Sequence, residues 1–151
     1  MEEIVAKREV PPLPEGVKVR YIRCGDFPRR EAAGLSEADF RNMAEKIRTG
    51  SCLNVELSLD ESNEESYLLM ESSPELIFLQ IWYGETGTAW ACFDPDYLDS
   101  GEEAPIEASD GQSVFPMKCT MKDREMAAKC VEWYAHTLEP YPGMDWLKET
   151  W

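Results

Sequence analysis

Carboxylates are the side chains of this sequence that offer the most chemistry. Asp94, Asp96 and Asp99 lie within one short segment, and several oxygens close together can bind Ca²⁺. A calcium loop places its ligands at regular positions, and Leu98 and Gly101 break that regularity. Two carboxylates can also hydrolyse glycosides, but acids are so frequent here that any pair can be close by chance. We therefore expect neither a metal site nor a catalytic carboxylate pair.

Other residues that catalysis needs are scarce. His136 is the one histidine of the sequence, and we expect it to be a partner of a helix dipole or a surface residue in the last turn of a helix. No Ser-His-Asp or Cys-His set, Gly-rich phosphate loop or His-containing metal motif stands out. The cysteines are odd in number, widely spaced and without a Cys-x-x-Cys pair, which predicts reduced and mostly buried thiols at Cys24, Cys52, Cys92, Cys119 and Cys130. These features predict a protein without enzymatic activity and without a cofactor.

Negative charge is concentrated in residues 49–117, which we call the acidic block. This block contains no Lys or Arg, whereas the segments before and after it are nearly neutral, and the whole chain carries a formal net charge of −15. Such a charge distribution repels nucleic acid and attracts basic proteins, raising their association rate in a salt-dependent way. The block contains fifteen acids: Glu56, Asp60, Glu61, Glu64, Glu65, Glu71, Glu75, Glu85, Asp94, Asp96, Asp99, Glu102, Glu103, Glu107 and Asp110.

Large aromatic residues accompany the acids in the acidic block. Protein interfaces use aromatic residues for energy and charges for steering, so this combination favours a dedicated binding face. In the simpler interpretation, Trp82 and Trp90 are core residues and the acids solvate a loop. The sequence is equally compatible with Trp90 as a core residue and with Trp90 as an interface residue. The candidate partner-binding residues are Glu85, Trp90, Asp94, Asp96, Tyr97, Asp99, Glu102 and Glu103.

Hydrophobic periodicity predicts an α+β domain. Ser36, followed by apolar residues at helical spacing and by Gly50, predicts a helix over residues 37–49. Thr120, with Asp123 three residues later, predicts the cap of a second helix. Strands are expected at residues 17–22, 53–59, 66–70, 76–83, 88–93 and 113–115, with a long loop over residues 94–112 and an irregular tail over residues 140–147. We expect an antiparallel sheet of about four to six strands packed against two main helices.

Length and composition predict a single domain over residues 1–151, in which the patterns describe the N-terminal extension, residues 1–35, least well. Apolar residues make up 43% of the chain, enough for a core, and no apolar run reaches the roughly 18 residues of a membrane span. The first residues lack the pattern of a signal peptide. We therefore expect a soluble, cytoplasmic protein. Truncating the predicted core residues Phe40, Leu79 or Val131 is expected to cost about 2 to 5 kcal/mol of stability.

The order of elements in the C-terminal two-thirds of the chain forms a family pattern. It consists of a long apolar strand (residues 76–83), a tight return strand (88–93), a polar loop, a short strand before Thr120, a helix that reads Arg-Glu-Met-Ala-Ala-Lys at residues 124–129 and runs to Trp133 and Tyr134, and a tail from Pro140 through Asp145-Trp146-Leu147. Over residues 52–149 this pattern resembles immunity proteins of bacterial polymorphic toxin systems, closest to the family found beside deaminase-type toxins.

The resemblance implies a non-enzymatic inhibitor that binds a basic cognate toxin domain, a deaminase, as a heterodimer in the cytoplasm. Such a protein keeps nucleic acid from the active site of the toxin. A cleft that binds nucleic acid is basic, so carboxylates can lie where phosphates would. If the toxin is a zinc deaminase, residues 94–103 could cover the pocket that takes the target base. We expect no nucleic acid and no membrane as a partner.

Other functions remain open at this point. An acidic adaptor or regulatory module would present the same charges without a toxin partner. A small enzyme would depend on carboxylates alone, so that one Asp or Glu substitution would abolish turnover. Adaptation to high salt would spread acids over the whole chain, and the nearly neutral ends argue against it.

Overall fold

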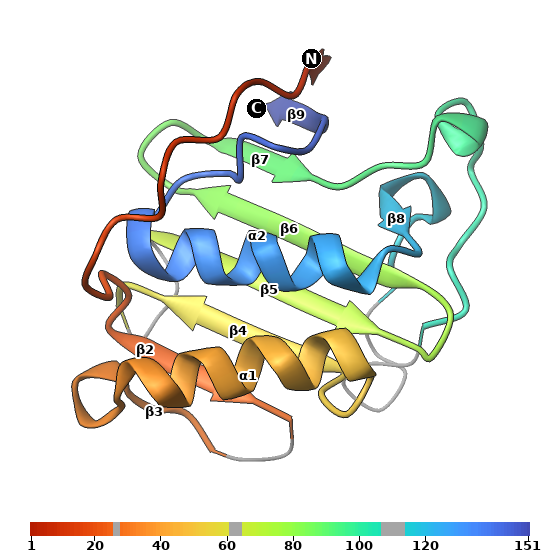
Figure 1. The fold of residues 1–151 in the computed structure, drawn as a ribbon. Coiled ribbons are helices and arrows are strands. Elements are labelled where there is room, and N and C mark those ends of the chain that lie inside the picture. Colours follow the sequence, from red (N-terminus) through yellow and green to blue (C-terminus); the bar gives the residue numbers. More distant parts are fainter. Residues whose placement is uncertain (26–27, 61–64, 107–113) are drawn as a thin grey trace.

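A large antiparallel sheet with two helices on one face forms the α+β fold of the protein (Figure 1). The computed structural model describes residues 1–25, 28–60, 65–106 and 114–151. The strands in these residues are β1 (Glu2–Val5), β2 (Tyr21–Cys24), β3 (Arg30–Glu31), β4 (Asn54–Ser58), β5 (Ser66–Ser72), β6 (Ile77–Tyr83), β7 (Thr88–Ala91), β8 (Thr120–Met121) and β9 (Trp146–Thr150). The helices are α1 (Glu37–Thr49) and α2 (Arg124–Thr137), with 3₁₀ helices η1 (Ala32–Gly34), η2 (Pro95–Tyr97) and η4 (Met117–Cys119). The predicted fold class and the two main helices are confirmed.

The sheet is larger than the sequence predicts. Its strand order is β1-β9-β7-β6-β5-β4-β2-β3, with β8 beside β6, so the described residues contribute nine strands. The prediction of about four to six strands is wrong because β1, β3, β8 and β9 are short or lie at the chain ends, where no long alternation of apolar and polar residues marks them. Every pair of neighbouring strands is antiparallel.

Helix α1 has the bounds that the sequence predicts. The Ser36 hydroxyl oxygen accepts a hydrogen bond from the backbone N–H of Asp39 at 3.2 Å, and the Asp39 carboxylate accepts one from the N–H of Ser36 at 2.8 Å. This reciprocal pair satisfies two N–H groups that the first helical turn would leave unpaired. At the other end Gly50 adopts a φ of 81°, a left-handed conformation that glycine reaches without strain.

Helix α2 begins later than predicted. Its N-cap is Asp123, whose carboxylate accepts from the N–H of Met126 at 3.0 Å. Thr120 does not cap the helix; it lies in β8, and its hydroxyl donates to the carbonyl oxygen of Met117 at 2.8 Å. Asp123 has the better geometry because it immediately precedes the first helical residue. No helix among the described residues is long and apolar enough to cross a membrane.

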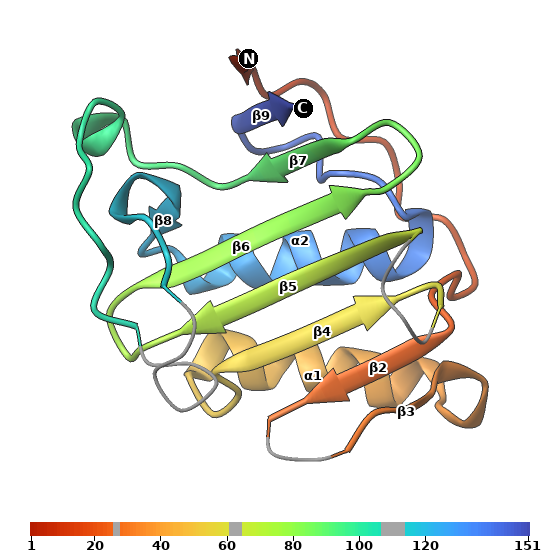
Figure 2. The same ribbon diagram turned by 180° about the vertical axis from the view of Figure 1, so that it is seen from behind.

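The two faces of the central strands have different coverings. Leu79 and Ile81 of β6 point to the helices and belong to the main hydrophobic cluster with Val131 and Phe40. Leu79, Val131 and Phe40 are buried as predicted. Successive residues of a strand point to opposite faces, so Phe78 points the other way and belongs to a second hydrophobic cluster. Figure 2 shows that second face, where the segment after β7 covers one end of the strands and neither helix is present.

The chain ends lie side by side at one edge of the sheet (Figure 1). β1 pairs with β9, and β9 pairs with β7, so the C-terminal strand is enclosed between two others. The prediction of an irregular tail therefore holds only up to Asp145. It fails beyond because pairing with β1 and β7 supplies backbone hydrogen bonds that the sequence of the tail does not announce.

Two of the predicted strands differ in the structure. The N-terminal strand expected at residues 17–22 lies at Tyr21–Cys24, where it pairs with β4. Before it, the N–H groups of Lys18 and Val19 donate to the carbonyl of Ala135 instead. Of the strand expected at residues 113–115, the described part is not in a strand; the neighbouring Pro116 forms an isolated bridge with Glu103. Residue 113, like residues 107–112 of the predicted loop, lies outside the described residues.

Candidate partner-binding surface

Residues 94–103, which we call the acidic loop, follow β7 and are shaped by local hydrogen bonds. Asp94 caps η2, because its Oδ1 accepts from the N–H of Asp96 at 3.0 Å. The N–H of Asp94 donates to the carbonyl oxygen of Lys118 at 2.9 Å, and the N–H of Ser100 donates to that of Tyr97 at 2.9 Å. The sequence Asp-Pro-Asp therefore starts a short helix and attaches it to the segment before β8.

Buried apolar residues attach the far end of the acidic loop to the sheet. The N–H of Met117 donates to the carbonyl oxygen of Glu102 at 2.9 Å, and the N–H of Ala104 donates to that of Phe115 at 2.7 Å. Phe115 packs on Phe78 of β6, with 4.5 Å between the ring centroids. The acidic loop is thus held from both ends against the second hydrophobic cluster.

The carboxylates of the acidic loop face solvent. Asp96, Asp99, Glu102 and Glu103 are exposed, and Asp94 is half-exposed. None of these five residues forms an ion pair with another described residue. The fold therefore concentrates negative charge here without neutralising it internally.

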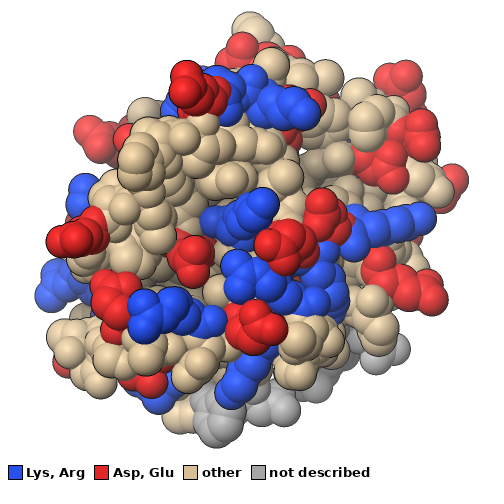
Figure 3. All heavy atoms as spheres, viewed as in Figure 1, with Lys and Arg blue, Asp and Glu red and all other residues tan. Residues whose placement is uncertain are grey.

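Lys118 contacts the acidic loop through its backbone and not through its charge. Its Nζ lies 2.7 Å from Oε1 of Glu2 in β1, and this hydrogen bond raises the pKa of Lys118. Figure 3 shows how the charged side chains are distributed on the helix-bearing side of the molecule. Lys and Arg are interleaved with Asp and Glu over the helices, whereas the upper right, where the segment with η2 lies, shows acidic side chains without basic ones among them.

Glu85 and Trp90 lie apart from the acidic loop. Glu85 is exposed in the turn between β6 and β7, and the chain then follows β7 to reach the loop, so the turn and the loop lie at opposite ends of the sheet (Figure 1). The structure thus divides the eight candidate residues into two groups. Six lie in the acidic loop, including the half-exposed Tyr97, and two lie near the β6–β7 turn.

The side chain of Trp90 packs against the core on one side and is partly exposed on the other. It pairs with Ile81 in the sheet, points to the helix-bearing face and packs against the main hydrophobic cluster. Its outer side is covered by Lys148, whose Nζ lies 5.2 Å from the centre of the ring and 3.6 Å from Oε1 of Glu3. The cation over the ring contributes about 0.5 to 1 kcal/mol at such a half-exposed site.

A groove of about 880 Å³ lies beside Trp90 at this end of the sheet. Sequence reasoning missed most of it, because its walls come from the ends of β5, β6 and β7, the turns beside them, β9 and the residue after α2, which are distant along the chain. The one sequence signal for this groove was the alternation of apolar residues at the ends of the strands. Its lining residues are Leu59, Glu65, Ser66, Tyr83, Gly84, Glu85, Thr86, Thr88, Trp90, Leu138 and Lys148.

Folding separates the other acids of the acidic block as well. Glu56 forms ion pairs with Arg23 at 3.2 Å and with Arg29 at 2.7 Å, both from outside the block. Glu71 is only 9% exposed, and its burial raises the pKa of its carboxyl group. Glu61, Glu64, Glu107 and Asp110 lie outside the described residues. The contiguous acidic block is therefore not one contiguous acidic surface.

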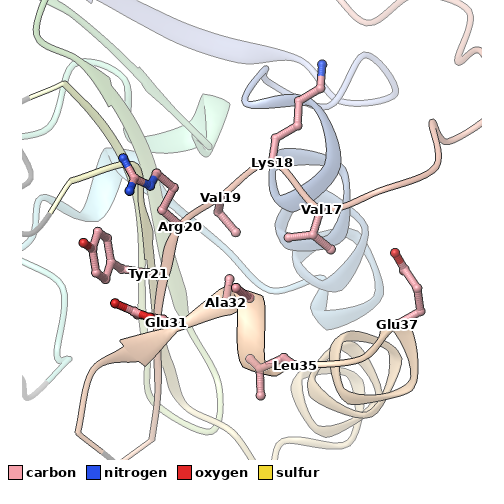
Figure 4. A pocket seen from close by; sticks show the side chains of 10 residues that line it. Val17, Lys18, Val19, Arg20, Tyr21, Glu31, Ala32, Leu35 and Glu37 are labelled. Carbon is pink, nitrogen blue, oxygen red and sulfur yellow. The ribbon is translucent and has the colours of Figure 1, made fainter.

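The described residues also bear on the predictions for metal ligands and for His136. No group of three or more His, Cys, Asp or Glu side chains among them could hold a metal ion. His136 is in the last turn of α2 as predicted, but it is buried rather than on the surface, with Nε2 at 3.4 Å from Oε2 of Glu37. A hollow of about 480 Å³ lies nearby (Figure 4), with aliphatic side chains such as Val19 and Ala32 toward its middle and charged ones such as Lys18 and Glu37 at its margin. It contains none of the candidate residues.

Comparisons with known proteins give no match. No protein-family model, no curated protein and no solved structure is significantly similar to this chain. Function must therefore be argued from the residues, the fold and the charge distribution.

Proposed function

We propose that the protein binds a basic protein partner through the acidic loop and inhibits it, as an immunity protein inhibits a toxin. One observation carries the proposal: the five carboxylates of residues 94–103 lie on a loop attached to the sheet at both ends, and no described basic side chain pairs with them. A protein that needed these acids only for solubility would have no reason to fix their backbone. Their arrangement suits a partner that supplies the missing positive charges.

Nucleic-acid-targeting toxins offer such a partner. The cleft of such an enzyme must be basic to bind phosphates. Carboxylates held on a fixed loop can occupy the phosphate positions, and they lose little conformational freedom on binding because the loop is already ordered by its hydrogen bonds. Charge also accelerates the encounter, which matters for an inhibitor that must capture a toxin before it acts.

The choice of a deaminase toxin rests on the resemblance of residues 52–149 alone. In a zinc deaminase the target base enters a pocket beside the metal, and the acidic loop would cover the entrance to that pocket. The complex would be a heterodimer formed in the cytoplasm of the producing cell. No catalytic role for the protein is part of the proposal.

An acidic adaptor or regulatory module is the second candidate function. The groove beside Trp90 favours it, because a second contact zone at the opposite end of the sheet would let the protein contact two partners. The two functions differ in the affinity for the partner and in the effect on the partner's activity. An adaptor needs no very tight partner and need not abolish its activity.

A co-purification with the protein encoded by the neighbouring gene tests the proposal. The tagged protein is used to capture that product, the affinity is measured as a function of salt, and growth of cells that express the partner alone is compared with growth of cells that express both. The proposal predicts a basic, toxic partner, a Kd in the nanomolar range or below, and weakening with salt. A weak or salt-independent complex, or one that leaves toxicity unchanged, would overturn it in favour of the adaptor.

A further inference from the structure

Two cysteines that are distant in the sequence meet at the end of α1. The Sγ atoms of Cys24 and Cys52 lie 2.8 Å apart. The sequence gives no sign of this contact, because 28 positions and the whole of α1 separate the two residues. All five cysteines are free thiols in the structure.

The backbone on both sides positions the two sulfur atoms. Cys24 is the last residue of β2 and pairs with Val55 of β4. The N–H of Gly25 donates to the carbonyl oxygen of Asn54 at 3.0 Å, which continues this pairing by one residue. The N–H of Cys52 donates to the carbonyl oxygen of Lys46 at 3.0 Å, in the last turn of α1. Strand pairing and the hydrogen bonds at the end of α1 thus bring the sulfur atoms together.

The two thiols differ in environment. Cys24 is half-buried, whereas Cys52 is 3% exposed and belongs to the main hydrophobic cluster. The hydrogen bond from the Cys24 thiol lowers the pKa of Cys52 to about 7, and the same bond raises the pKa of Cys24. The sulfur that an external disulfide can reach is therefore that of Cys24, and the buried Cys52, 2.8 Å away, is placed to accept the proton of Cys24 and later to resolve a mixed disulfide.

We propose that Cys24 and Cys52 form a thiol–disulfide site that reacts with a low-molecular-weight disulfide of the glutathione class. In the first step Cys24 passes its proton to Cys52 and attacks one sulfur of the oxidant, so that a mixed disulfide forms on Cys24, the S–S bond of the oxidant breaks, and one glutathione thiolate leaves. In the second step the other protein thiol attacks the bound protein sulfur, the Cys24–Cys52 bond forms, and the second glutathione leaves. Two electrons pass from the cysteines to the oxidant, and the two glutathione thiolates take up the one thiol proton of the pair and one proton from solvent.

The remaining cysteines are much less suited to this reaction. Burial raises the pKa of Cys119 to about 11 and that of Cys92 to about 12. The Cys92 thiol donates to the carbonyl oxygen of Cys119 at 3.3 Å and not to its sulfur. The pKa of Cys130 is raised well above its usual value by burial, and its Sγ lies 3.9 Å from Sδ of Met144. Oxidation is therefore expected at one pair only.

A bond between Cys24 and Cys52 would join β2 to the connection between α1 and β4. It closes a loop that contains α1 and so removes conformations from the unfolded chain. Because the sulfur atoms already lie close together, little distortion of the fold is needed. We expect Tm to rise by about 5 to 15 °C on oxidation. This inference is independent of the proposed function, since it needs no partner.

The test treats the purified, full-length protein with glutathione disulfide and measures its intact mass, followed by peptide mapping with trypsin and chymotrypsin. Wild-type protein is expected to lose two hydrogens and to yield a linked pair of peptides that contain Cys24 and Cys52. Cys119→Ala is the matched control and should behave like the wild type. Cys24→Ala and Cys52→Ala should form no internal disulfide, and Cys52→Ala should carry a glutathione adduct on Cys24.

Three outcomes would overturn the proposal. One is a wild-type mass that stays unchanged in glutathione disulfide. Another is a disulfide that maps to Cys92, Cys119 or Cys130. The third is a mixed disulfide at Cys24 that is not resolved by Cys52. Because the decisive measurement uses the wild type, a variant that fails to fold does not weaken the test.

Discussion

A buried hydrogen bond connects helix α2 to the sheet, and its contribution to stability can be measured. The hydroxyl oxygens of Tyr134 in α2 and Ser66 at the start of β5 lie 2.6 Å apart. Ser66 is 4% exposed and Tyr134 is fully buried, so the pair is shielded from bulk water. Removing one hydroxyl leaves the other unpaired in the interior, which costs about 1 to 3 kcal/mol.

We expect Tyr134→Phe and Ser66→Ala each to lower the free energy of unfolding by about 1 to 2 kcal/mol. In the double variant both polar groups are gone, so the cost should be close to that of one single variant. The resulting coupling energy is about 1 kcal/mol. Urea denaturation monitored by tryptophan fluorescence measures these differences, provided that the slope against urea stays the same.

Tyr141→Phe is the matched control, because Tyr141 is half-buried and its hydroxyl makes no hydrogen bond with a described residue. Its stability should stay within about 0.5 kcal/mol of the wild type. If the costs of Tyr134→Phe and Ser66→Ala simply add in the double variant, the hydroxyls do not act as a pair and the reasoning fails.

Three further predictions follow from burial. Leu79→Ala should cost about 2 to 5 kcal/mol in urea denaturation, because Leu79 is fully buried between the sheet and the helices; a cost below about 1 kcal/mol would contradict the packing described. Burial raises the pKa of Glu71 above its ordinary 4.5. The stability that the neutral carboxyl group contributes is therefore present below pH 4.5 and is lost as the pH rises through the raised pKa. Glu71→Gln should therefore stabilise the protein at neutral pH, with a smaller gain below pH 4.5, as measured by urea denaturation at the two pH values. An equal gain in stability at the two pH values would contradict this prediction. Burial raises the pKa of Tyr134 from 10.0 to about 12, so stability should fall as pH rises over this interval, and Tyr134→Phe should make that fall shallower. The pH dependence of the urea midpoint tests this, and an identical slope in the variant would refute it.

Features that depend on neighbouring residues were predictable from the sequence. The bounds of α1 follow from Ser36, Asp39 and Gly50, whose effects are local. The hairpins β4–β5 and β6–β7 follow from alternating apolar residues and turn residues between them. In contrast, β9 is a strand because β1 and β7 lie beside it, and no pattern in the tail reports those neighbours.

The candidate surface shows the same division. Exposure of the acids in residues 94–103 was predictable from their composition and from the Pro and Gly among them. Their separation from Glu85 was not, because a strand such as β7 carries residues that are close in sequence to opposite ends of a sheet. The contact between Cys24 and Cys52 was equally hidden, since it arises from the packing of α1 on the sheet.

The central claim is that the acidic loop binds a basic partner, and paired charge reversals test it most directly. Asp96→Lys/Glu102→Lys changes two exposed residues of the loop and spares Asp94, which caps η2. Glu9→Lys/Glu15→Lys makes the same change of charge at two exposed residues of the N-terminal segment. Thermal melting first checks that both variants fold, and calorimetry at low and high salt then measures their affinity for the partner.

The account predicts that the loop variant binds at least about tenfold more weakly than the wild type and loses part of the salt dependence, while the control stays within about threefold. Wild-type affinity of the folded loop variant would contradict it. Weakening in the control alone would place the interface on the N-terminal segment instead.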